Sequence, residues 1–98
     1  MVIGANGSLG SEICKQLMKE EINFIPVTRK ELDITIKIDL LENFIVNSLP
    51  DVIINCAANL GIESCKEDIG QALEINTFFP NKLFSISKKN NINLIQIS

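Results

Sequence analysis

The sequence predicts an α/β fold in which helices cover a parallel sheet, and three observations indicate it. A glycine-rich turn at residues 4–10 follows an apolar run and leads into a helical pattern. A second apolar run, at residues 52–58, is continuous rather than alternating, as in a parallel strand buried on both faces. Apolar runs and helical patterns then alternate along the chain. We therefore expect one domain, residues 1–98, with a Rossmann-like doubly wound parallel sheet that is incomplete and holds its first four to five strands.

The glycines of the turn have the spacing G-x-x-G-x-x-G, one residue longer than the dehydrogenase fingerprint G-x-G-x-x-G. We expect Gly4 to permit a tight turn, Gly7 to let a phosphate approach the backbone, and Gly10 to let the helix pack near the strand. The helix start would offer free N–H groups and a positive dipole end to an anion. The alternative is a glycine-rich turn without a ligand, but its position between a strand and a helix favours dinucleotide binding.

The first helix is expected to begin at a cap formed by Asn6 or Ser8 and to end near Asn23, which tolerates the left-handed conformation. A second strand follows at residues 24–27, where Pro26 limits hydrogen bonding on one side. The helix residues expected to face the core recur at helical spacing and are Leu9, Ile13, Cys14, Leu17 and Met18.

The residues after the second strand indicate which dinucleotide would bind. NAD-binding folds usually place Asp or Glu there to bind the ribose hydroxyls, whereas this chain continues with Thr28, Arg29 and Lys30. Such a cationic turn suits a 2′-phosphate, so we expect NADP, contacted by Arg29. Glu31 lies near enough to keep NAD as an alternative cofactor. A basic turn that is merely exposed to solvent, with no ligand, is the other alternative.

Residues 32–35 come only about four residues after the second strand, too few for a regular parallel crossover. We therefore expect an irregular edge segment, in which Asp33 either reaches a nucleotide base or serves as a polar turn residue. A second helix is predicted from Asp39 and Glu42, which have capping-box spacing, and it should end at Pro50.

In a doubly wound sheet, the strand at residues 52–58 should lie beside the first strand, and a ligand should bind between the carboxyl ends of the two. Ala57 and Ala58 at its end leave room for a cofactor near the backbone. A helix is expected over residues 69–89, kinked at Pro80, whose missing N–H cannot bond the carbonyl of Asn76. A last strand is expected at residues 92–98.

Composition excludes several classes of function. The net charge of −3 argues against nucleic-acid binding, and no apolar run approaches ~18 residues, so we expect no membrane span. The chain has no histidine, which removes histidine-based metal sites and triads, and we expect no metal. Its three cysteines form no C-x-x-C pair and no signal peptide is visible, which favours reduced thiols in the cytoplasm.

Five stretches of the chain resemble the extended short-chain dehydrogenase/reductase superfamily and, more narrowly, the dTDP-4-dehydrorhamnose reductase family. They are GANGSLG at 4–10, RKELDIT at 29–35, PDVIINCAA at 50–58, IESCKE at 62–67 and IN at 75–76. The resemblance implies reduction of the 4-keto group of a nucleotide-linked deoxysugar by NADPH or NADH, in the biosynthesis of dTDP-rhamnose and cell-surface polysaccharide. A nucleotide-sugar substrate is the partner it implies, and a homodimer is a further candidate assembly.

By position, the resemblance implies that the cofactor pyrophosphate meets Gly7, Ser8 and Leu9. It implies that Asp33 and Ile34 flank the adenine and that Asn76 is a structural asparagine. The ribose on the nicotinamide side would pass Ala58, Asn59 and Leu60.

The chain departs from the family at Asn59 and Leu60, where relatives often have an aromatic residue or histidine followed by threonine. Ser64 and Lys66 also differ from the usual lysine and glutamate. The family's Tyr-x-x-x-Lys pair, whose tyrosine donates the proton, has no counterpart, because the chain contains no tyrosine. We expect that pair to lie beyond Ser98. We therefore interpret the chain as a cofactor-binding piece truncated before the catalytic pair and the sugar pocket, without catalytic residues and inactive on its own.

Two alternatives stay open at this point. A fragment of a nucleotide-sugar epimerase or dehydratase on the same scaffold would differ in an acid beside the catalytic hydroxyl, in sequence beyond residue 98. A non-catalytic regulatory subunit would bind NADP tightly and associate with a partner enzyme.

Overall fold

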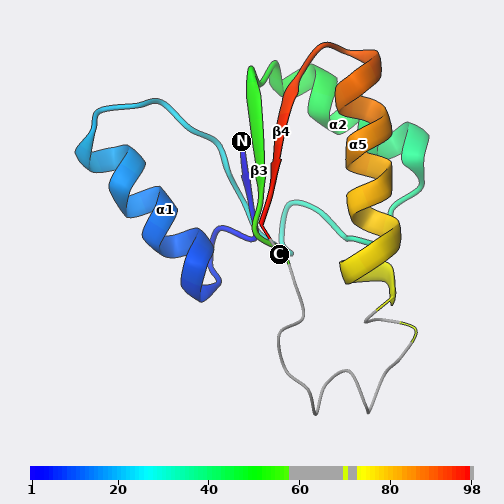
Figure 1. Cartoon of the computed structure of the whole chain (residues 1–98), viewed down its shortest axis with the longest axis horizontal. Coiled ribbons are helices and arrows are strands. Elements are labelled where there is room, and N and C mark those ends of the chain that lie inside the picture. Colours follow the sequence, from blue (N-terminus) through cyan, green and yellow to red (C-terminus); the bar gives the residue numbers. More distant parts are fainter. Residues whose placement is uncertain (58–69, 71–72, 98) are drawn as a thin grey trace.

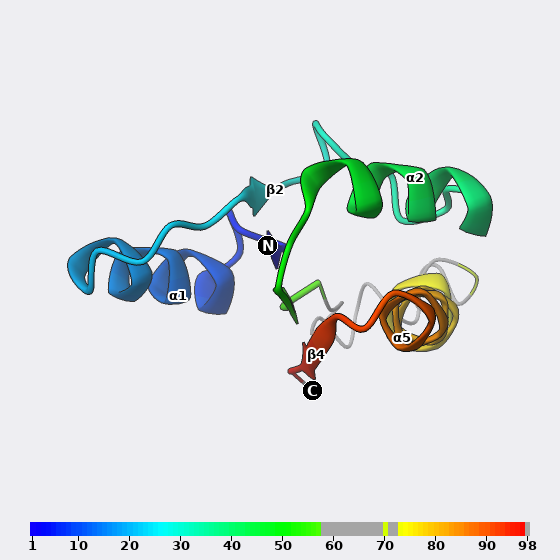
Figure 2. The same ribbon diagram turned by 90° about the horizontal axis from the view of Figure 1, so that it is seen from above.

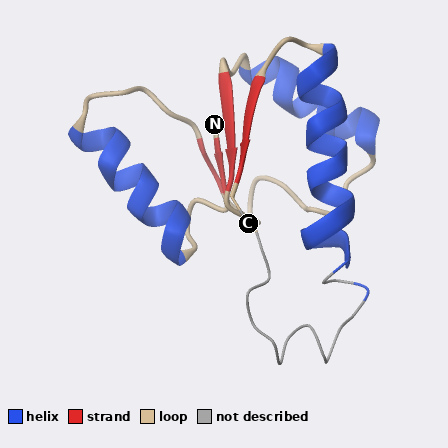
Figure 3. Ribbon diagram, in the orientation of Figure 1, coloured by secondary structure: helices blue, strands red, loops and turns tan. Residues whose placement is uncertain are grey.

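A parallel sheet with helices on both faces forms the centre of the molecule, as the computed structural model of residues 1–57, 70 and 73–97 shows (Figures 1 and 3). Its strand order is β2-β1-β3-β4, and all neighbours run parallel. The strands are β1 (Val2–Ile3), β2 (Pro26–Val27), β3 (Val52–Asn55) and β4 (Asn93–Gln96). This arrangement confirms the predicted Rossmann-like doubly wound sheet, with β3 beside β1.

The helices divide between the two faces of the sheet. Seen along the sheet in Figure 2, α1 (Ser8–Lys19) lies on one face, and α2 (Ile38–Ser48) and α5 (Phe79–Lys89) lie on the other. This division follows from the crossovers, because the chain moves outward from β1 to β2 and then returns across β1 to β3. None of the helices in the described part of the chain is long and apolar enough to cross a membrane.

The hydrophobic core lies between the sheet and the pair α2 and α5. Its buried residues are Met1, Ile3, Val27, Leu32, Leu41, Ile45, Ile53, Phe79, Leu83 and Ile86. On α1 only Gly10 is buried, while Leu9 is 45% and Met18 is 69% exposed. The predicted core face of α1 is therefore wrong at these two positions, because only the side of α1 against the sheet is covered.

Three predicted helix ends were wrong. The N-cap of α1 is Gly7 rather than Asn6 or Ser8, and no side chain caps it. After α1, the left-handed residue is Glu21 rather than Asn23. The helix α2 begins after Lys37, so Asp39 already lies inside it and accepts a hydrogen bond from the Leu40 N–H.

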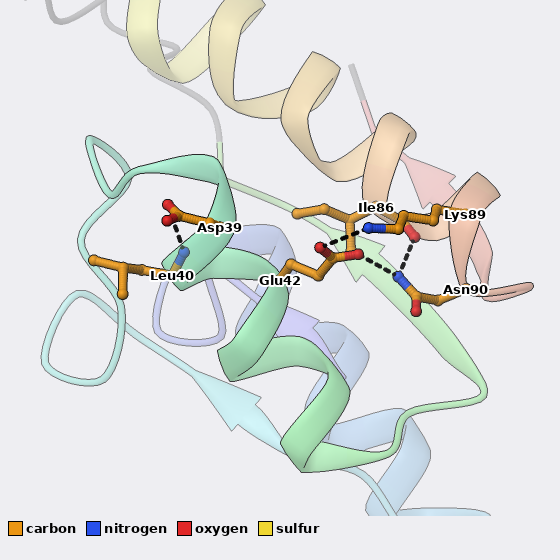
Figure 4. Close-up of polar contacts among 6 residues, drawn as sticks. All are labelled: Asp39, Leu40, Glu42, Ile86, Lys89 and Asn90. Atoms are coloured by element: carbon orange, nitrogen blue, oxygen red, sulfur yellow. Dashed lines mark hydrogen bonds and ion pairs between the residues drawn. The ribbon is translucent and has the colours of Figure 1, made fainter.

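A clasp of polar side chains joins the two helices that cover the core (Figure 4). The carboxylate of Glu42 on α2 accepts hydrogen bonds from Lys89 Nζ at 3.3 Å and Asn90 Nδ2 at 2.9 Å. The amide of Asn90 also donates to the carbonyl of Ile86, 2.8 Å away. These bonds lower the pKa of Glu42, the one from Asn90 having the larger effect. Because its carboxylate makes these bonds at the end of α5, Glu42 does not cap its own helix.

The strands are shorter than predicted, and one helix changes its hydrogen-bonding pattern. The strand β2 holds only the last two residues of the predicted segment 24–27. The N–H groups of Val2 and Gly4 donate to the carbonyls of Ile25 and Val27, so this edge does not need the missing N–H of Pro26. The predicted helix 69–89, expected to kink at Pro80, is divided in its described part: a π-helical turn, Glu74–Phe78, lies directly before α5, and Pro80 stands in the first turn of α5.

Some predictions fall on residues that the structure does not describe. The last strand, predicted over residues 92–98, is β4 and spans only Asn93–Gln96. Its predicted final residue, Ser98, lies outside the described residues. The first residue of the predicted helix, Ile69, lies outside them as well.

Candidate functional site

A cavity of ≈ 140 Å³ opens at the carboxyl ends of β1, β2 and β3. This is the edge of the sheet at which ligands of open α/β folds bind. Its lining residues are Ile3, Gly4, Asn6, Gly7, Val27, Thr28, Arg29, Leu32, Ile34, Cys56, Ala57 and Ile75. The chain thus brings together the glycine-rich turn, the turn after β2 and the end of β3, which are far apart in sequence.

The glycine-rich turn is held in place by backbone contacts on both sides. Gly4 has φ +79°, and a Cβ atom there would lie 2.9 Å from the backbone N of Ala57. Its N–H donates to the carbonyl of Val27 at 2.9 Å, while the N–H of Cys56 donates to the carbonyl of Ile3 at 2.9 Å. The prediction that Gly4 permits a tight turn is confirmed, because both its φ and the available space exclude a side chain.

Gly10 and Gly7 have different surroundings. A Cβ atom at Gly10 would lie 2.0 Å from the carbonyl oxygen of Gly4, so α1 packs directly on the residue that follows β1, in agreement with the predicted close approach of helix and strand. A Cβ atom at Gly7 would meet only that same oxygen, at an ordinary 3.5 Å. Gly7 is exposed and lines the cavity, so a side chain there would fill cavity space without disturbing the backbone.

The N-terminus of α1 begins at this turn and suits an anion. No side chain caps it, and its first turn contains no acidic residue. The first N–H groups of a helix have no intrahelical acceptor, and the helix dipole places partial positive charge there. Together with the space beside Gly7, this end of the cavity fits a phosphate or diphosphate group.

Asn55 controls how the chain leaves β3 on the other side of the cavity. It is 0% exposed, its Nδ2 donates to Gln96 Oε1 at 2.9 Å, and its Oδ1 accepts from the Ala57 N–H at 3.1 Å. The second bond turns the backbone immediately after the strand. Consequently β3 ends at Asn55, earlier than predicted, and Cys56 and Ala57 line the cavity.

The turn after β2 is closed by a capping box that the sequence interpretation missed. Oε2 of Glu31 accepts hydrogen bonds from the N–H of Thr28, at 2.7 Å, and from the Thr28 hydroxyl. The N–H of Lys30 donates to Thr28 Oγ1 at 3.2 Å. The spacing T-x-x-E at residues 28–31 is the signal that could have identified it. These bonds from Thr28 lower the pKa of Glu31.

The carboxylate of Asp33, like that of Glu31, accepts two hydrogen bonds from a nearby threonine. Its Oδ1 accepts from the N–H and the hydroxyl of Thr35, at 2.9 and 2.8 Å, and these bonds lower its pKa. Neither Asp33 nor Glu31 lines the cavity, whereas Arg29 does. As predicted for residues 32–35, the chain forms no strand here, and the same holds for the whole of 28–37; buried Leu32 packs in the core.

The predicted site residues therefore fall into three groups. Those that line the cavity are Gly4, Gly7, Arg29, Ile34 and Ala57. Those that lie outside its lining are Ser8, Leu9, Gly10 and Asp33. Ala58, Asn59 and Leu60 lie outside the described residues. Thr28, Asn6, Cys56 and Ile75 line the cavity without having been predicted.

The described lining supplies binding groups rather than acid–base groups. Burial raises the pKa of the Cys56 thiol, so it is neutral near neutral pH and a poor nucleophile. The charged side chain in this described lining is the guanidinium of Arg29. Among the residues that the structure describes, no three Cys, Asp or Glu side chains gather as metal ligands.

Comparisons with known proteins agree with this architecture. Residues 1–98 match the family model described as RmlD substrate binding domain. A solved dTDP-4-dehydrorhamnose reductase of Clostridium acetobutylicum ATCC 824, an RfbD ortholog, is 36% identical, with a TM-score of 0.89 over 99% of this chain and 34% of its own. A second one, from Bacillus anthracis str. Ames in complex with NADP, is 29% identical, with a TM-score of 0.82 over 95% of this chain and 33% of its own.

A curated protein gives the same picture. The spore coat polysaccharide biosynthesis protein SpsK of Bacillus subtilis (strain 168) is 32% identical over 76 residues, which are 78% of this chain and 26% of SpsK. The chain thus spans about a third or less of the length of these relatives.

Proposed function

The chain belongs to the RmlD substrate binding domain family, and we propose that it forms the dinucleotide-binding part of an NADPH-dependent reductase that acts on a nucleotide-linked 4-keto sugar. The observation that carries this proposal is the cavity at the carboxyl ends of β1, β2 and β3, which is lined by both the glycine-rich turn and Arg29. The similar Bacillus anthracis reductase was solved with NADP. When bound, the reduced nicotinamide would supply the hydride.

The chain's own residues would hold the dinucleotide at several points. The diphosphate would lie beside Gly7, against the N–H groups of Ser8 and Leu9 at the start of α1. Arg29 would face the 2′-phosphate, and Ile34 would lie near the adenine. Gly4 would line the site and shape the turn, and Gly10 would let α1 pack on that turn.

The end of β3 would pass the ribose on the nicotinamide side. Ala57 lines the cavity, and Ala58, Asn59 and Leu60 follow it in the chain. We also propose a cytoplasmic location, because both cysteines described by the structure are free thiols. A dTDP-linked 4-keto sugar, as named for the reductase relatives, is the proposed substrate class.

Titration with NADPH tests the proposal directly. The chain is expected to bind NADPH, and Gly7→Ala is expected to weaken the affinity about tenfold, because the new methyl group fills space beside the diphosphate. Binding is measured by NADPH fluorescence and by calorimetry, with circular dichroism as the check on folding. An affinity that Gly7→Ala leaves unchanged would place the diphosphate elsewhere.

Cofactor choice is tested at Arg29. Arg29→Ala is expected to weaken NADPH binding about tenfold and NADH binding less than about twofold, because only NADPH carries the 2′-phosphate. Lys19→Ala on α1 is the matched control, since Lys19 is an exposed cation that does not line the cavity. Equal losses for both dinucleotides would make Arg29 an ordinary surface charge.

A further inference from the structure

The turn after β2 presents a choice between two kinds of charged group. In dinucleotide-binding sheets, an acid near this point accepts hydrogen bonds from the adenosine ribose, or a nearby Arg accommodates a 2′-phosphate. This chain has both, with Glu31 and Asp33 as acids and Arg29 as the cation. The structure separates them, because Arg29 lines the cavity and the two acids do not.

Glu31 is withdrawn from the cavity by specific bonds. One oxygen of its carboxylate accepts from both the N–H and the hydroxyl of Thr28, and the N–H at 2.7 Å is a close contact. The N–H groups of Glu31 and Leu32 both donate to the carbonyl of Thr28, at 3.2 and 3.1 Å. Leu32 is 4% exposed within the core. The turn is therefore held at its start by the hydrogen bonds of Thr28 and at its end by the burial of Leu32.

The bonds of the capping box also determine where Arg29 lies. Arg29 stands between Thr28 and Lys30, whose N–H donates to the Thr28 hydroxyl oxygen at 3.2 Å. Its backbone is therefore enclosed within the closed turn, and Thr28 and Arg29 line the cavity together. Loss of the Glu31 carboxylate would leave the Thr28 N–H without its acceptor and would loosen this turn.

Resting on the dinucleotide site proposed above, we propose that Glu31 is a specificity-determining residue that favours NADP over NAD by remaining bound to Thr28. The bond has two effects. It keeps the carboxylate from the ribose hydroxyls that NAD would offer, and it holds the turn in the form that presents Arg29 to a 2′-phosphate. Glu31 thus acts through Thr28 and Arg29, without touching the dinucleotide itself.

Two substitutions at Glu31 separate this role from that of a ribose acceptor. Glu31→Ala is expected to weaken NADPH binding about three- to tenfold and NADH binding less than about twofold. The reason is that the hydrogen bonds from Thr28 to Glu31, which hold the turn that presents Arg29 to the 2′-phosphate, are lost. Glu31→Gln is expected to keep the preference for NADPH, since a glutamine side-chain oxygen also serves in a capping box. Glu12→Ala, which removes an exposed carboxylate on α1, is the matched control.

A readout independent of the dinucleotide tests the bond itself. In an NMR titration of the chain, the pKa of Glu31 is expected below its ordinary value, because Thr28 donates to the carboxylate. Thr28→Val removes the hydroxyl donor and should raise this pKa. The charged group facing Glu31 is Lys30, whose positive charge also lowers the pKa, so Lys30→Met is measured beside it.

The outcomes distinguish this proposal from the proposed function. If Glu31→Ala weakened NADH binding more than NADPH binding, Glu31 would be a ribose acceptor and the proposal would be overturned. Equal losses of affinity for the two dinucleotides would also overturn it. A Glu31 pKa that does not respond to Thr28→Val would also overturn it. If the unsubstituted chain binds neither dinucleotide, the proposed function fails together with this inference.

Discussion

Gly10→Ala is expected to lower the free energy of unfolding by about 3 kcal/mol. The added Cβ would lie 2.0 Å from the carbonyl oxygen of Gly4 and 2.8 Å from its carbonyl carbon. Both are backbone atoms, so neither can rotate away as a side chain would. The turn cannot retreat either, because Gly4 and Ala5 both donate to the carbonyl of Val27, at 2.9 and 3.1 Å. Urea unfolding followed by circular dichroism measures the loss.

Gly7→Ala is the matched control in the same turn. Its Cβ would meet only the oxygen of Gly4 at 3.5 Å, and its φ of −77° suits alanine. We expect a loss of about 1 kcal/mol or less, the usual difference between glycine and alanine at an uncapped helix start. Equal stability of the Gly10→Ala and Gly7→Ala variants would contradict the close packing of α1 on the turn.

Asn55→Leu is expected to lower the free energy of unfolding by about 2 kcal/mol. Leucine is similar in size but accepts no hydrogen bond, so the N–H of Ala57 loses its acceptor beside a fully buried position. The bond between Asn55 and Gln96, which joins β3 to β4, is lost as well. Because Ala57 lines the cavity, the affinity for NADPH should fall in the variant that remains folded.

Asn93→Leu serves as the control on the neighbouring strand. Asn93 begins β4 and is exposed, so its substitution should change the stability by no more than about 0.5 kcal/mol. Thermal and urea unfolding of both variants provide the comparison. If Asn55→Leu were as stable as the unsubstituted chain, the bend after β3 would not depend on this amide.

Local residue chemistry predicted the central part of the fold well. A continuous apolar run indicated that β3 is buried between neighbours, and it lies beside β1 as expected. The glycines at positions 4 and 10 were assigned their roles correctly, because each role depends on the absence of a Cβ atom. The irregular segment after β2 followed from the shortness of the connection alone.

The helix ends and the exposed face of α1 were not predictable in this way. Several residues suit an N-cap, and which one is used depends on where the backbone enters the helix. Asp39 and Glu42 have capping-box spacing, yet Glu42 bonds Lys89 at the end of α5 and Asn90, the C-cap of that helix. Leu9 and Met18 fit an apolar helix face, but no described element covers them.

By itself the sequence determined the order and type of the elements and the position of the glycine-rich turn. These depend on properties that each residue carries locally, such as the allowed φ of glycine and the hydrophobicity of consecutive side chains. Only the tertiary structure decided which groups line the cavity. Glu31 and Arg29 are two residues apart, but Glu31 turns back to Thr28 and Arg29 faces the cavity. That difference depends on which hydrogen-bond partners come within reach once the chain has folded, and residue spacing alone does not specify it.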